Sequence, residues 1–559
     1  SGEGILILSG SNQYKGTSVS AGGVLQIDGS VAGEAWSEKP GTIAGSGTIK
    51  GNLTNKSIVQ PGSYDITNPL RTFSPGTLSV SGELTSTGTI AVAANGSSVY
   101  SKLKVEKSAA VGGTTFAAVP GSVYEVPVSE GDPTPYTKVI TVTTGTISGA
   151  LSTNYADFTG MLSAKGKIND GSKSLSLQLK RHNNLGAMTG RQQQTYTLLD
   201  SKFTGQSSMY SLYSLEADKA KRTLTAIYGG AQLNQAAAIQ SDTTIGTAVA
   251  ARLDYVNSPT PQSLSLLPGF APSTFAANTI IPLELGGQNS WWMKALRTWG
   301  SNDAQQDLPG IDNRSFGFVV GQDRKVNDYW RIGYLAGYGQ NRVTSTMAAS
   351  DSHGYRAGLY GGYQKGAFDL TTYLDYGRQN NHASRYLTAL SLQADSNYNS
   401  NTLSFGITGR YNLHQGKNKL WQLRPYAGLY IARYRQDGYR ETGTDNTYNQ
   451  IADSLANTYS TGEIGLELAR RIPSGRYALQ VGYKKVLSGS DPAMTVAYTI
   501  DSTKKITVSG SEQDREYLVI GLTAQGQIGK NLTIDGQLNH QQGSSSRSLT
   551  ATLTLRKVW

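Results

Sequence analysis

The sequence predicts an all-β protein in which a β-solenoid is followed by an amphipathic helix and a twelve-stranded antiparallel transmembrane β-barrel. Glycine accounts for 65 of the 559 residues and only 16% of the residues are charged, against about 25% in an average globular domain. Short alternating segments fill residues 1–228, whereas long alternating segments follow residue 290. Of the 32 tyrosines, 21 lie after residue 290, as do six of the seven tryptophans. The two halves are therefore expected to face different surroundings.

Residues 1–228 repeat short apolar and polar alternations that close in glycine. Examples are residues 5–10, 23–29, 42–47 and 77–82. Short strands with such turns, recurring roughly every 10 to 20 residues, predict the rungs of a solenoid, each of which buries its apolar face on the next. Stacked rungs need a first stable end, so we expect residues 73–228 to act as a folding template on which later-emerging rungs can propagate.

Residues 229–290 are predicted to be a linker that carries one helix, at 231–256. Apolar residues recur there at spacings near three and four, which is typical of an amphipathic helix. At 1.5 Å per residue this helix is about 39 Å long. Isolated helices of this kind commonly pack on a domain, and a special role is the alternative. The apolar positions are Leu233, Ala236, Ile239, Ile245, Ala248, Ala251 and Leu253.

Residues 291–559 alternate strictly over long stretches. In one of them, Trp330, Ile332 and Tyr334 share a face, while Arg331 and Gly333 share the other. A soluble β-sandwich also alternates, but its strands are short and its apolar face is inside. Strands of about 10 to 15 residues with aromatics near their ends fit a lipid-spanning barrel with its aromatic girdles. No stretch approaches the roughly 20 apolar residues of a transmembrane helix.

Connection lengths support twelve strands. Tight connections alternate with long polar ones at 301–312, 379–400, 435–458 and 488–513. Outer-membrane barrels place short turns in the periplasm and long loops outside, and an even, closed sheet leaves no unpaired edge in lipid. The strands are expected near 291–301, 313–322, 329–343, 353–363, 367–378, 401–411, 420–434, 459–470, 476–487, 514–527, 532–541 and 548–559.

Three segments resemble the autotransporters of Gram-negative bacteria, which use type V secretion. Residues 6–29 are similar to the family's passenger-associated repeat, Leu-x-Leu-x-Gly-x-Asn-x-Tyr-x-Gly. Residues 423–430 resemble its Pro-Tyr-Ala barrel strand. The terminal strand resembles its assembly signal, although Lys557 replaces the usual aromatic or apolar residue three positions from the end. The signal residues are Leu549, Leu553, Leu555 and Trp559.

The resemblance implies an outer-membrane translocator that exports and displays its own upstream passenger. The helix at 231–256 would thread the barrel lumen, and residues 1–228 would form a right-handed parallel β-helix stalk on the cell surface. The implied partners are outer-membrane lipid, the barrel assembly machinery, periplasmic chaperones and the passenger, with no cofactor. We expect the signal peptide to lie outside these residues. The alternative is the carboxy-terminal part of a surface protease or adhesin whose active domain lies upstream.

The residues themselves indicate little catalytic chemistry. Zero cysteines exclude a thiolate metal site and a cysteine nucleophile. The five histidines lie far apart without His-x-x-x-His spacing, so no metal site is predicted. Residues 16–18 resemble the nucleophile motif of subtilisin-like proteases, but the Asp and His that should precede it are missing from residues 1–15. The net charge of +11 comes from scattered Lys and Arg, so we expect no nucleic-acid partner.

Five charged residues of the predicted strands fall on the lumen face of the barrel. Water or paired charges satisfy such groups in a barrel lumen. Their simplest role is to solvate the lumen, and a more specific one is to hold the helix in the pore. These residues are Arg331, Asp369, Arg410, Glu463 and Glu467.

Overall fold

The chain folds into two compact units, Ser1–Leu224 and Thr225–Trp559, in a computed structural model. Each unit is described by itself. The structure describes residues 4–68, 71–129, 132–229, 262–264, 279–281, 289–306, 308–413, 421–444, 446–472, 475–489, 493–509, 514–529 and 532–558.

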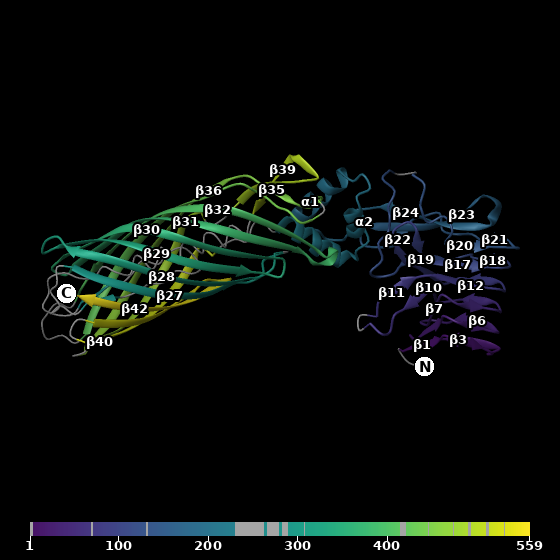
Figure 1. The fold of residues 1–559 in the computed structure, drawn as a ribbon, viewed down its shortest axis with the longest axis horizontal. Helices are drawn as coiled ribbons and strands as arrows, with labels where there is room; N and C mark the ends of the chain where they lie inside the picture. The colour runs from purple at the N-terminus through teal and green to yellow at the C-terminus, as the bar shows by residue number, and fades with distance from the viewer. Residues whose placement is uncertain are drawn as a thin grey trace. The chain divides into compact units, whose positions relative to one another are not determined.

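The first unit is a β-helix whose rungs stack through three parallel sheets (Figure 1). The first sheet contains β1 (Ile5–Leu8), β4 (Val24–Ile27), β7 (Thr42–Gly45), β10 (Ile58–Tyr64), β14 (Thr89–Val92) and β19 (Thr115–Ala118), with β11 (Phe73–Pro75) antiparallel to β10. The second contains β2 (Ser11–Asn12), β5 (Ser30–Val31), β8 (Thr48–Ile49), β12 (Thr77–Val80), β17 (Lys102–Val105) and β20 (Ile140–Val142). The third contains β3 (Gly16–Val19), β6 (Glu34–Ser37), β9 (Leu53–Asn55), β13 (Leu84–Ser86), β18 (Ala109–Ala110) and β21 (Ile147–Ser148).

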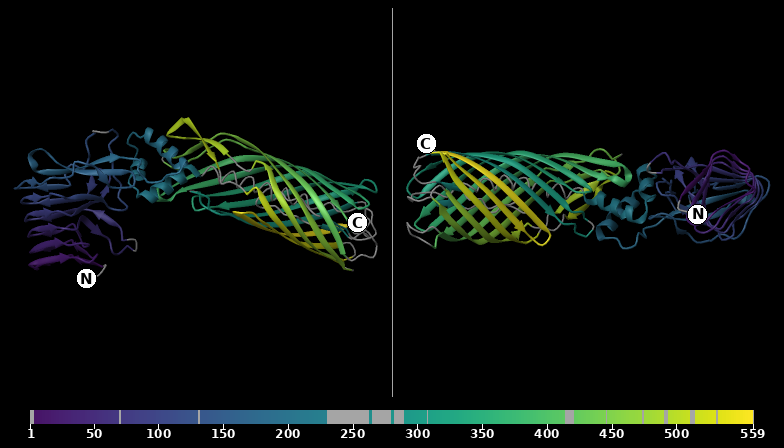
Figure 2. Two further views of the ribbon diagram at one scale, coloured as in Figure 1. Left: turned by 180° about the vertical axis from the view of Figure 1, so that it is seen from behind. Right: turned by 90° about the horizontal axis from the view of Figure 1, so that it is seen from below.

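Columns of aliphatic side chains hold the rungs together. Ile43, Val59 and Ile90 follow one another up the first sheet, and all three are fully buried. The alternation seen in the sequence places one such residue from each strand in the interior, where it stacks on its counterpart from the rung below. Figure 2 shows these stacked rungs from two further sides. The predicted solenoid is confirmed over β1 to β21.

A polar ladder runs up the third sheet inside the apolar interior. The Oγ of Ser37 donates to Asn55 Oδ1 at 2.9 Å, and Asn55 Nδ2 donates to Ser86 Oγ at 3.0 Å. Thr114 extends the ladder with a 2.9 Å hydrogen bond to Ser86. Buried polar groups are costly when a partner is removed, so Asn55 ties three rungs together.

We expect Asn55→Leu to destabilise these rungs by about 1–3 kcal/mol, because it leaves two buried hydroxyl groups without their amide partner. Amide hydrogen exchange of β6, β9 and β13 measures the change in opening free energy. Lys56→Leu, at the exposed neighbouring position, is the control and should change it by less than about 0.5 kcal/mol. Equal effects of the two substitutions would contradict the role of the ladder.

The carboxy-terminal part of the first unit is not solenoid. β22 (Ala156–Asp157), β23 (Leu162–Ile168) and β24 (Ser174–Arg181) are antiparallel and cover β20, with a 3₁₀ turn at Asp170–Ser172. Helices α1 (Gly190–Ser201), α2 (Ser207–Tyr213) and a helix at 217–229 follow. The expectation of rungs up to residue 228 is therefore corrected. Residues 190–229 have few of the glycine-closed alternations that the earlier rungs share.

The turn from β24 into these helices is fixed by a small polar cluster. Thr189 and Gln192 form a reciprocal capping box at the start of α1, the arrangement that satisfies the free N–H groups of a first helical turn. Arg181 pairs with Asp200 at 2.5 Å, and the hydroxyl of Tyr213 also donates to Asp200. Burial, followed by these contacts with Asp200, raises the pKa of Tyr213 well above its usual value. The helices thus close the last rung with satisfied polar groups. One further antiparallel pair is formed by β15 (Ala94–Asn95) and β16 (Val99–Tyr100).

The second unit contains a closed antiparallel barrel of twelve strands, as the sequence predicts (Figure 1). Each barrel strand pairs with the next barrel strand along the chain, and β27 pairs with β42 over thirteen residues to close the ring. The strands are β27 (Asn289–Asn302), β28 (Ile311–Lys325), β29 (Trp330–Thr344), β30 (Ala348–Lys365), β31 (Phe368–Leu387), β32 (Leu392–Tyr411), β33 (Trp421–Gln436), β36 (Leu455–Ile472), β37 (Gly475–Ser488), β40 (Glu516–Gly529), β41 (Leu532–Gln542) and β42 (Ser546–Val558).

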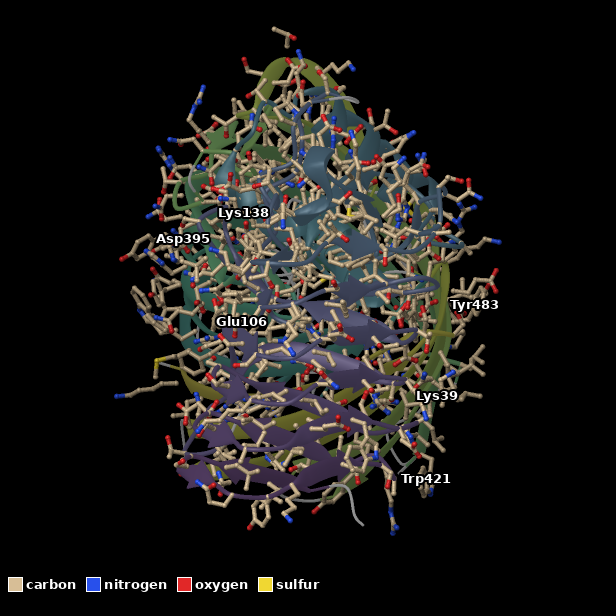
Figure 3. The ribbon with its side chains drawn as sticks, turned by 90° about the vertical axis from the view of Figure 1, so that its right-hand side faces the viewer. Lys39, Glu106, Lys138, Asp395, Trp421 and Tyr483 are labelled. Atoms are coloured by element: carbon tan, nitrogen blue, oxygen red, sulfur yellow. The ribbon has the colours of Figure 1, made fainter. Side chains whose placement is uncertain are left out.

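Alternation gives the barrel an apolar outer face. Leu359, Ile464 and Leu522 are all more than half exposed, a pattern that would be costly in water but suits lipid. Aromatic residues lie beside the short turns, as in the girdles of transmembrane barrels. Trp421 and Tyr483 project from the outer side of the wall (Figure 3). No helix among the described residues is both long and apolar enough to span a membrane.

The two ends of the barrel differ. At one end, here called the turn end, the strands are joined by segments such as 326–329, 366–367 and 473–474. At the other, the loop end, segments 437–454 and 489–515 carry a separate four-stranded sheet. Its strands are β34 (Tyr439–Arg440), β35 (Gln450–Ala452), β38 (Ala493–Tyr498) and β39 (Asp501–Ser509).

One predicted loop is wrong. Residues 379–400 were expected to form a long polar connection, but β31 and β32 run through them and leave only 388–391 between the strands, as a 3₁₀ turn at Thr388–Leu390. Each of these two strands has 20 residues, about twice the 9–11 that a tilted strand needs to cross the membrane. Beyond the lipid both faces of a strand are polar, so the alternation that marks a strand is lost there.

Candidate functional site

Charged side chains line the inner face of the barrel and pair across its strands. Six of them form three ion pairs, and each of the six side chains is less than a tenth exposed. Removing one member of such a pair costs several kcal/mol of stability, because it leaves the other charge buried without a partner. The pairs are Arg331–Asp323, Arg356 Nε–Asp375 Oδ2 at 2.9 Å and Arg424 Nη2–Asp369 Oδ2 at 2.5 Å.

Arg424 lies at the centre of the largest of these groups. It faces Glu467 directly in the register of β33 and β36, with Nη1 to Oε1 at 3.6 Å. Its other nitrogen reaches Asp369 on β31, one strand beyond its neighbour β32. Arg410, on that intervening strand, faces Asp369 in register. Two arginines and two carboxylates therefore share one stretch of the lumen wall.

A second group ties β27 to β30. The indole N–H of Trp292 donates to the hydroxyl of Tyr360 at 2.8 Å, and that hydroxyl donates to Asp323 at 2.9 Å. Asp323 is also the partner of Arg331. Side chains from four successive strands, β27 to β30, are thus linked inside the barrel.

Glycines leave room for an aromatic ring on the opposite wall. A Cβ at Gly465 or Gly482 would lie 2.5 or 2.3 Å from the hydroxyl oxygen of Tyr426. That hydroxyl donates to Glu463 Oε1 at 2.5 Å. Tyr426 therefore lies flat across two neighbouring strands because neither carries a side chain beneath it.

We expect Gly482→Val to destabilise the barrel by at least about 1–3 kcal/mol, the usual cost of overpacking, because it displaces Tyr426 from Glu463. The urea midpoint of the barrel refolded in detergent measures this. Gly536→Val is the control, since a Cβ at Gly536 meets nothing within 4 Å. Adding Tyr426→Ala to Gly482→Val should recover part of the loss, and no recovery would contradict the steric explanation.

At the loop end, Arg385 organises a different cluster. It holds Glu441 through two hydrogen bonds, of 3.1 Å from Nε and 2.5 Å from Nη2. Nη2 also donates to the carbonyl of Tyr448 at 2.8 Å. Glu441 in turn accepts from the backbone N–H of Gln450 at 2.7 Å. A buried ion pair therefore joins the β31–β32 hairpin to the loop that carries β34 and β35.

The loop end is closed on another side by Asp514. This carboxylate accepts hydrogen bonds from the residues of the 543–545 turn and from Ser546. Burial alone would raise its pKa, but the hydrogen bonds from Ser544, Ser546 and Ser545 outweigh burial and keep the pKa below its usual value. The last two loops are thus tied together by a charged acceptor.

All five residues that the sequence assigned to the lumen lie on its wall, but the structure brings only three of them into one group. Arg331, Asp369, Arg410, Glu463 and Glu467 are all buried on the inner face, and Asp369, Arg410 and Glu467 belong to the group around Arg424. Their role in holding a pore helix stays a prediction. Leu549, Leu553 and Leu555 lie on the outer face of β42. Trp559 and the seven apolar positions from Leu233 to Leu253 lie outside the described residues.

Sequence reasoning missed Asp323, Arg356, Arg424 and Lys484, the last of which donates to Gln541 Oε1 at 2.7 Å. All four lie on the inner face by the same alternation, so period-two patterning could have found them. The Arg385 cluster offers no such signal, because its members come from the polar ends of strands and from loops. Among the described residues, no three His, Asp or Glu side chains are grouped to hold a metal ion.

Residues 291–539 match the family model of the autotransporter β-domain. The chain carries an autotransporter β-domain. The autotransporter barrel is an outer-membrane barrel, in agreement with its apolar outer face and charged, paired interior. Structural similarity extends to the translocator domain of the autotransporter NalP from Neisseria meningitidis, at 16% identity and a TM-score of 0.42 over 49% of this chain and 89% of that one. The transport unit of the autotransporter AIDA-I from Escherichia coli is similar at 16% identity and a TM-score of 0.37, over 48% of this chain and 90% of that one.

Curated relatives are longer proteins. An extracellular serine protease of Serratia marcescens is 24% identical over 274 residues, which are 47% of this chain and 26% of the relative. The esterase EstA of Pseudomonas aeruginosa is 23% identical over 330 residues, which are 53% of this chain and 48% of the relative. The chain thus spans between about a quarter and about half the length of these two relatives.

Proposed function

We propose that the barrel exports the preceding part of its own chain across the outer membrane and displays the β-helix on the cell surface as a stalk. The observation that carries this proposal is the position of the chain on either side of residues 230–288. Residues 226–228 contact the loop end, through Arg385, Gln450 and Tyr498. Strand β27 begins with Asn289 at the turn end, where it pairs with Arg324. The two segments that flank this connection therefore lie at opposite ends of the barrel.

The lumen is the physically acceptable route for this connection. A polypeptide that passed outside the wall would expose peptide groups to lipid, each at a cost of several kcal/mol. The inner wall, in contrast, offers Arg331, Asp369, Arg410, Glu463 and Glu467. The predicted helix at 231–256, about 39 Å long, is longer than the roughly 25 Å apolar band of such a barrel. We therefore propose that this predicted helix fills the pore.

The β-helix is proposed to guide the folding of what lies upstream. Its carboxy-terminal end is closed by β22–β24 and the three helices, so rungs are added at the opposite end. The parallel sheets of a β-helix extend rung by rung, so a formed rung is a template for the strands of the next one. A passenger whose rungs stack on the β-helix would therefore fold from a formed surface.

A second candidate is that the chain is the carboxy-terminal part of a surface protease or adhesin. The names of the two relatives, a serine protease and an esterase, favour a hydrolase passenger. The described residues themselves contain no arrangement that resembles a catalytic triad. We expect a hydrolase assay on this chain alone to be negative, and activity would overturn that view. Outer-membrane lipid, the barrel assembly machinery, periplasmic chaperones and the passenger are the proposed partners.

Cysteine labelling on intact cells tests the orientation, because the native chain has no cysteine. Lys56→Cys in the stalk and Lys505→Cys at the loop end should react with a membrane-impermeant maleimide. Asp328→Cys, in an exposed turn-end segment, should react only after the outer membrane is permeabilised. Labelling of residue 328 but not of residue 56 on intact cells would reject the proposed export.

A further inference from the structure

Side chains from three hairpins at the loop end donate hydrogen bonds to backbone carbonyls of residues 226–228. Arg385 donates to the carbonyl of Ala226 at 3.4 Å. Gln450 Nε2 donates to the carbonyl of Ile227 at 2.7 Å, and the hydroxyl of Tyr498 donates to the same oxygen at 3.1 Å. These donors come from β31, β35 and β38, so each hairpin supplies one. Contacts to carbonyl oxygens alone recognise a helical segment but no particular sequence.

The side chain of Tyr228 supplies the sequence specificity that contacts to backbone carbonyls lack. It is only 2% exposed and packs in a cluster of apolar groups from the same three hairpins. Tyr398 and Tyr439 stack on each other in this cluster, with ring centroids 5.2 Å apart. We call this cluster the Tyr228 pocket; its main members are Ala383, Tyr398, Tyr439, Met494, Val496 and Val508.

The surrounding sequence makes Tyr228 unique for such a pocket. Between Tyr213 and Tyr255 it is the only aromatic residue. A shift of the chain by one residue would turn a helix by about 100° and move it by 1.5 Å, which would withdraw the ring and offer Ile227 or Gly229 in its place. Neither of these residues carries an aromatic ring that could pack in this cluster.

We propose that the Tyr228 pocket is a binding site for the chain's own segment at 225–228, and that Tyr228 sets the register at which the exported chain comes to rest. The inference rests on the proposed function, since only a chain that moves through the barrel needs a resting register. The Arg385–Glu441 pair positions the pocket, because it joins two of the three hairpins. Tyr228 in place closes the loop end around the segment.

The first test moves the ring by one helical turn. In the full chain, the exchange Leu224→Tyr with Tyr228→Leu keeps the composition and the helix face but shifts the tyrosine by four residues, about 6 Å. A p-benzoyl-phenylalanine at position 506, beside the pocket, reports the neighbour by mass spectrometry. We expect crosslinks at residues 227–229 in the parent chain and at 223–225 in the exchange variant. Crosslinks that stay at 227–229 in the variant would overturn the proposal.

A second test does not depend on the exchange variant folding. The full chain in planar bilayers should open at least about 100-fold more often with Tyr228→Ser, because a large buried ring is lost, whereas Tyr228→Phe should stay close to the parent. Arg385→Gln should raise the opening rate as well. The matched control is Lys505→Ala, which removes the exposed Lys505–Asp453 pair of the same hairpins and should leave the rate unchanged. Equal rates for Tyr228→Ser and Lys505→Ala would refute the pocket.

Maleimide labelling of Lys56→Cys in the same cells separates this inference from the proposed function. An unlabelled stalk in the parent chain would mean that export itself is wrong. A labelled stalk with an unchanged register would reject only the role of Tyr228.

Discussion

Replacing Arg424 by methionine is expected to destabilise the barrel by about 3–5 kcal/mol, the usual cost of breaking a buried ion pair by removing one partner. Arg424 is 2% exposed and lies between Asp369, at 2.5 Å, and Glu467, at 3.6 Å. Methionine fills similar space but leaves two carboxylates facing each other without their shared cation. Urea unfolding of the barrel in lipid vesicles, followed by heat-modifiable gel mobility, measures the loss.

Arg433→Met is the matched control for this prediction. Arg433 lies on the same strand, and its side chain is exposed on the outer face, so the change should stay within about 0.5 kcal/mol. Adding Asp369→Asn and Glu467→Gln to Arg424→Met should recover part of the stability, because neutral amides remove the two carboxylates that Arg424 had paired with. If Arg424→Met behaves like Arg433→Met, the lumen ion pairs contribute little to the fold.

The barrel could be predicted from the sequence because a strand in lipid alternates strictly. Leu403 and Phe405 face lipid while Ser404 faces the lumen, and the same period repeats in every strand. The pairing of particular charges could not be predicted, because it depends on the register and tilt of strands that are not neighbours. Arg424 reaches Asp369 across an intervening strand, and no spacing in the sequence reveals that contact.

The loop end was beyond sequence reasoning for a related reason. Residues 379–400 are polar on both faces once the strands leave the lipid, so they resemble a loop although they form a hairpin. Tyr228 lies more than 150 residues before Arg385, and its neighbours in space come from three separate hairpins. The residues next to each of them in the sequence show no pattern that would mark a binding pocket. Only the closed barrel brings them together.

The end of the last strand is where the other large effect is expected. Strand β42 closes the barrel by pairing with both β27 and β41, and at its turn end Lys557 faces Trp291 and Leu532 in register. An extended segment with alternating apolar residues can add to an exposed sheet edge through main-chain hydrogen bonds. We propose that the assembly machinery reads this segment, with Leu549, Leu553, Leu555 and Trp559 as its side-chain signal.

Deleting residues 557–559, or changing Trp559 to alanine, is therefore expected to lower the amount of barrel in the outer membrane while the β-helix keeps its own fold. The deletion removes the last paired residues of a closing strand, and an unclosed sheet edge in lipid costs several kcal/mol per unpaired group. Lys557→Tyr should act in the opposite direction, because it restores an aromatic residue where the lysine faces Trp291. The comparison is heat-modifiable barrel in outer-membrane fractions at matched expression, with Lys504→Tyr in an exposed loop-end strand as the control. Equal amounts for the parent, the deletion and Trp559→Ala would show that β42 only completes the ring, since a strand that serves as a signal cannot lose its end without loss of assembly.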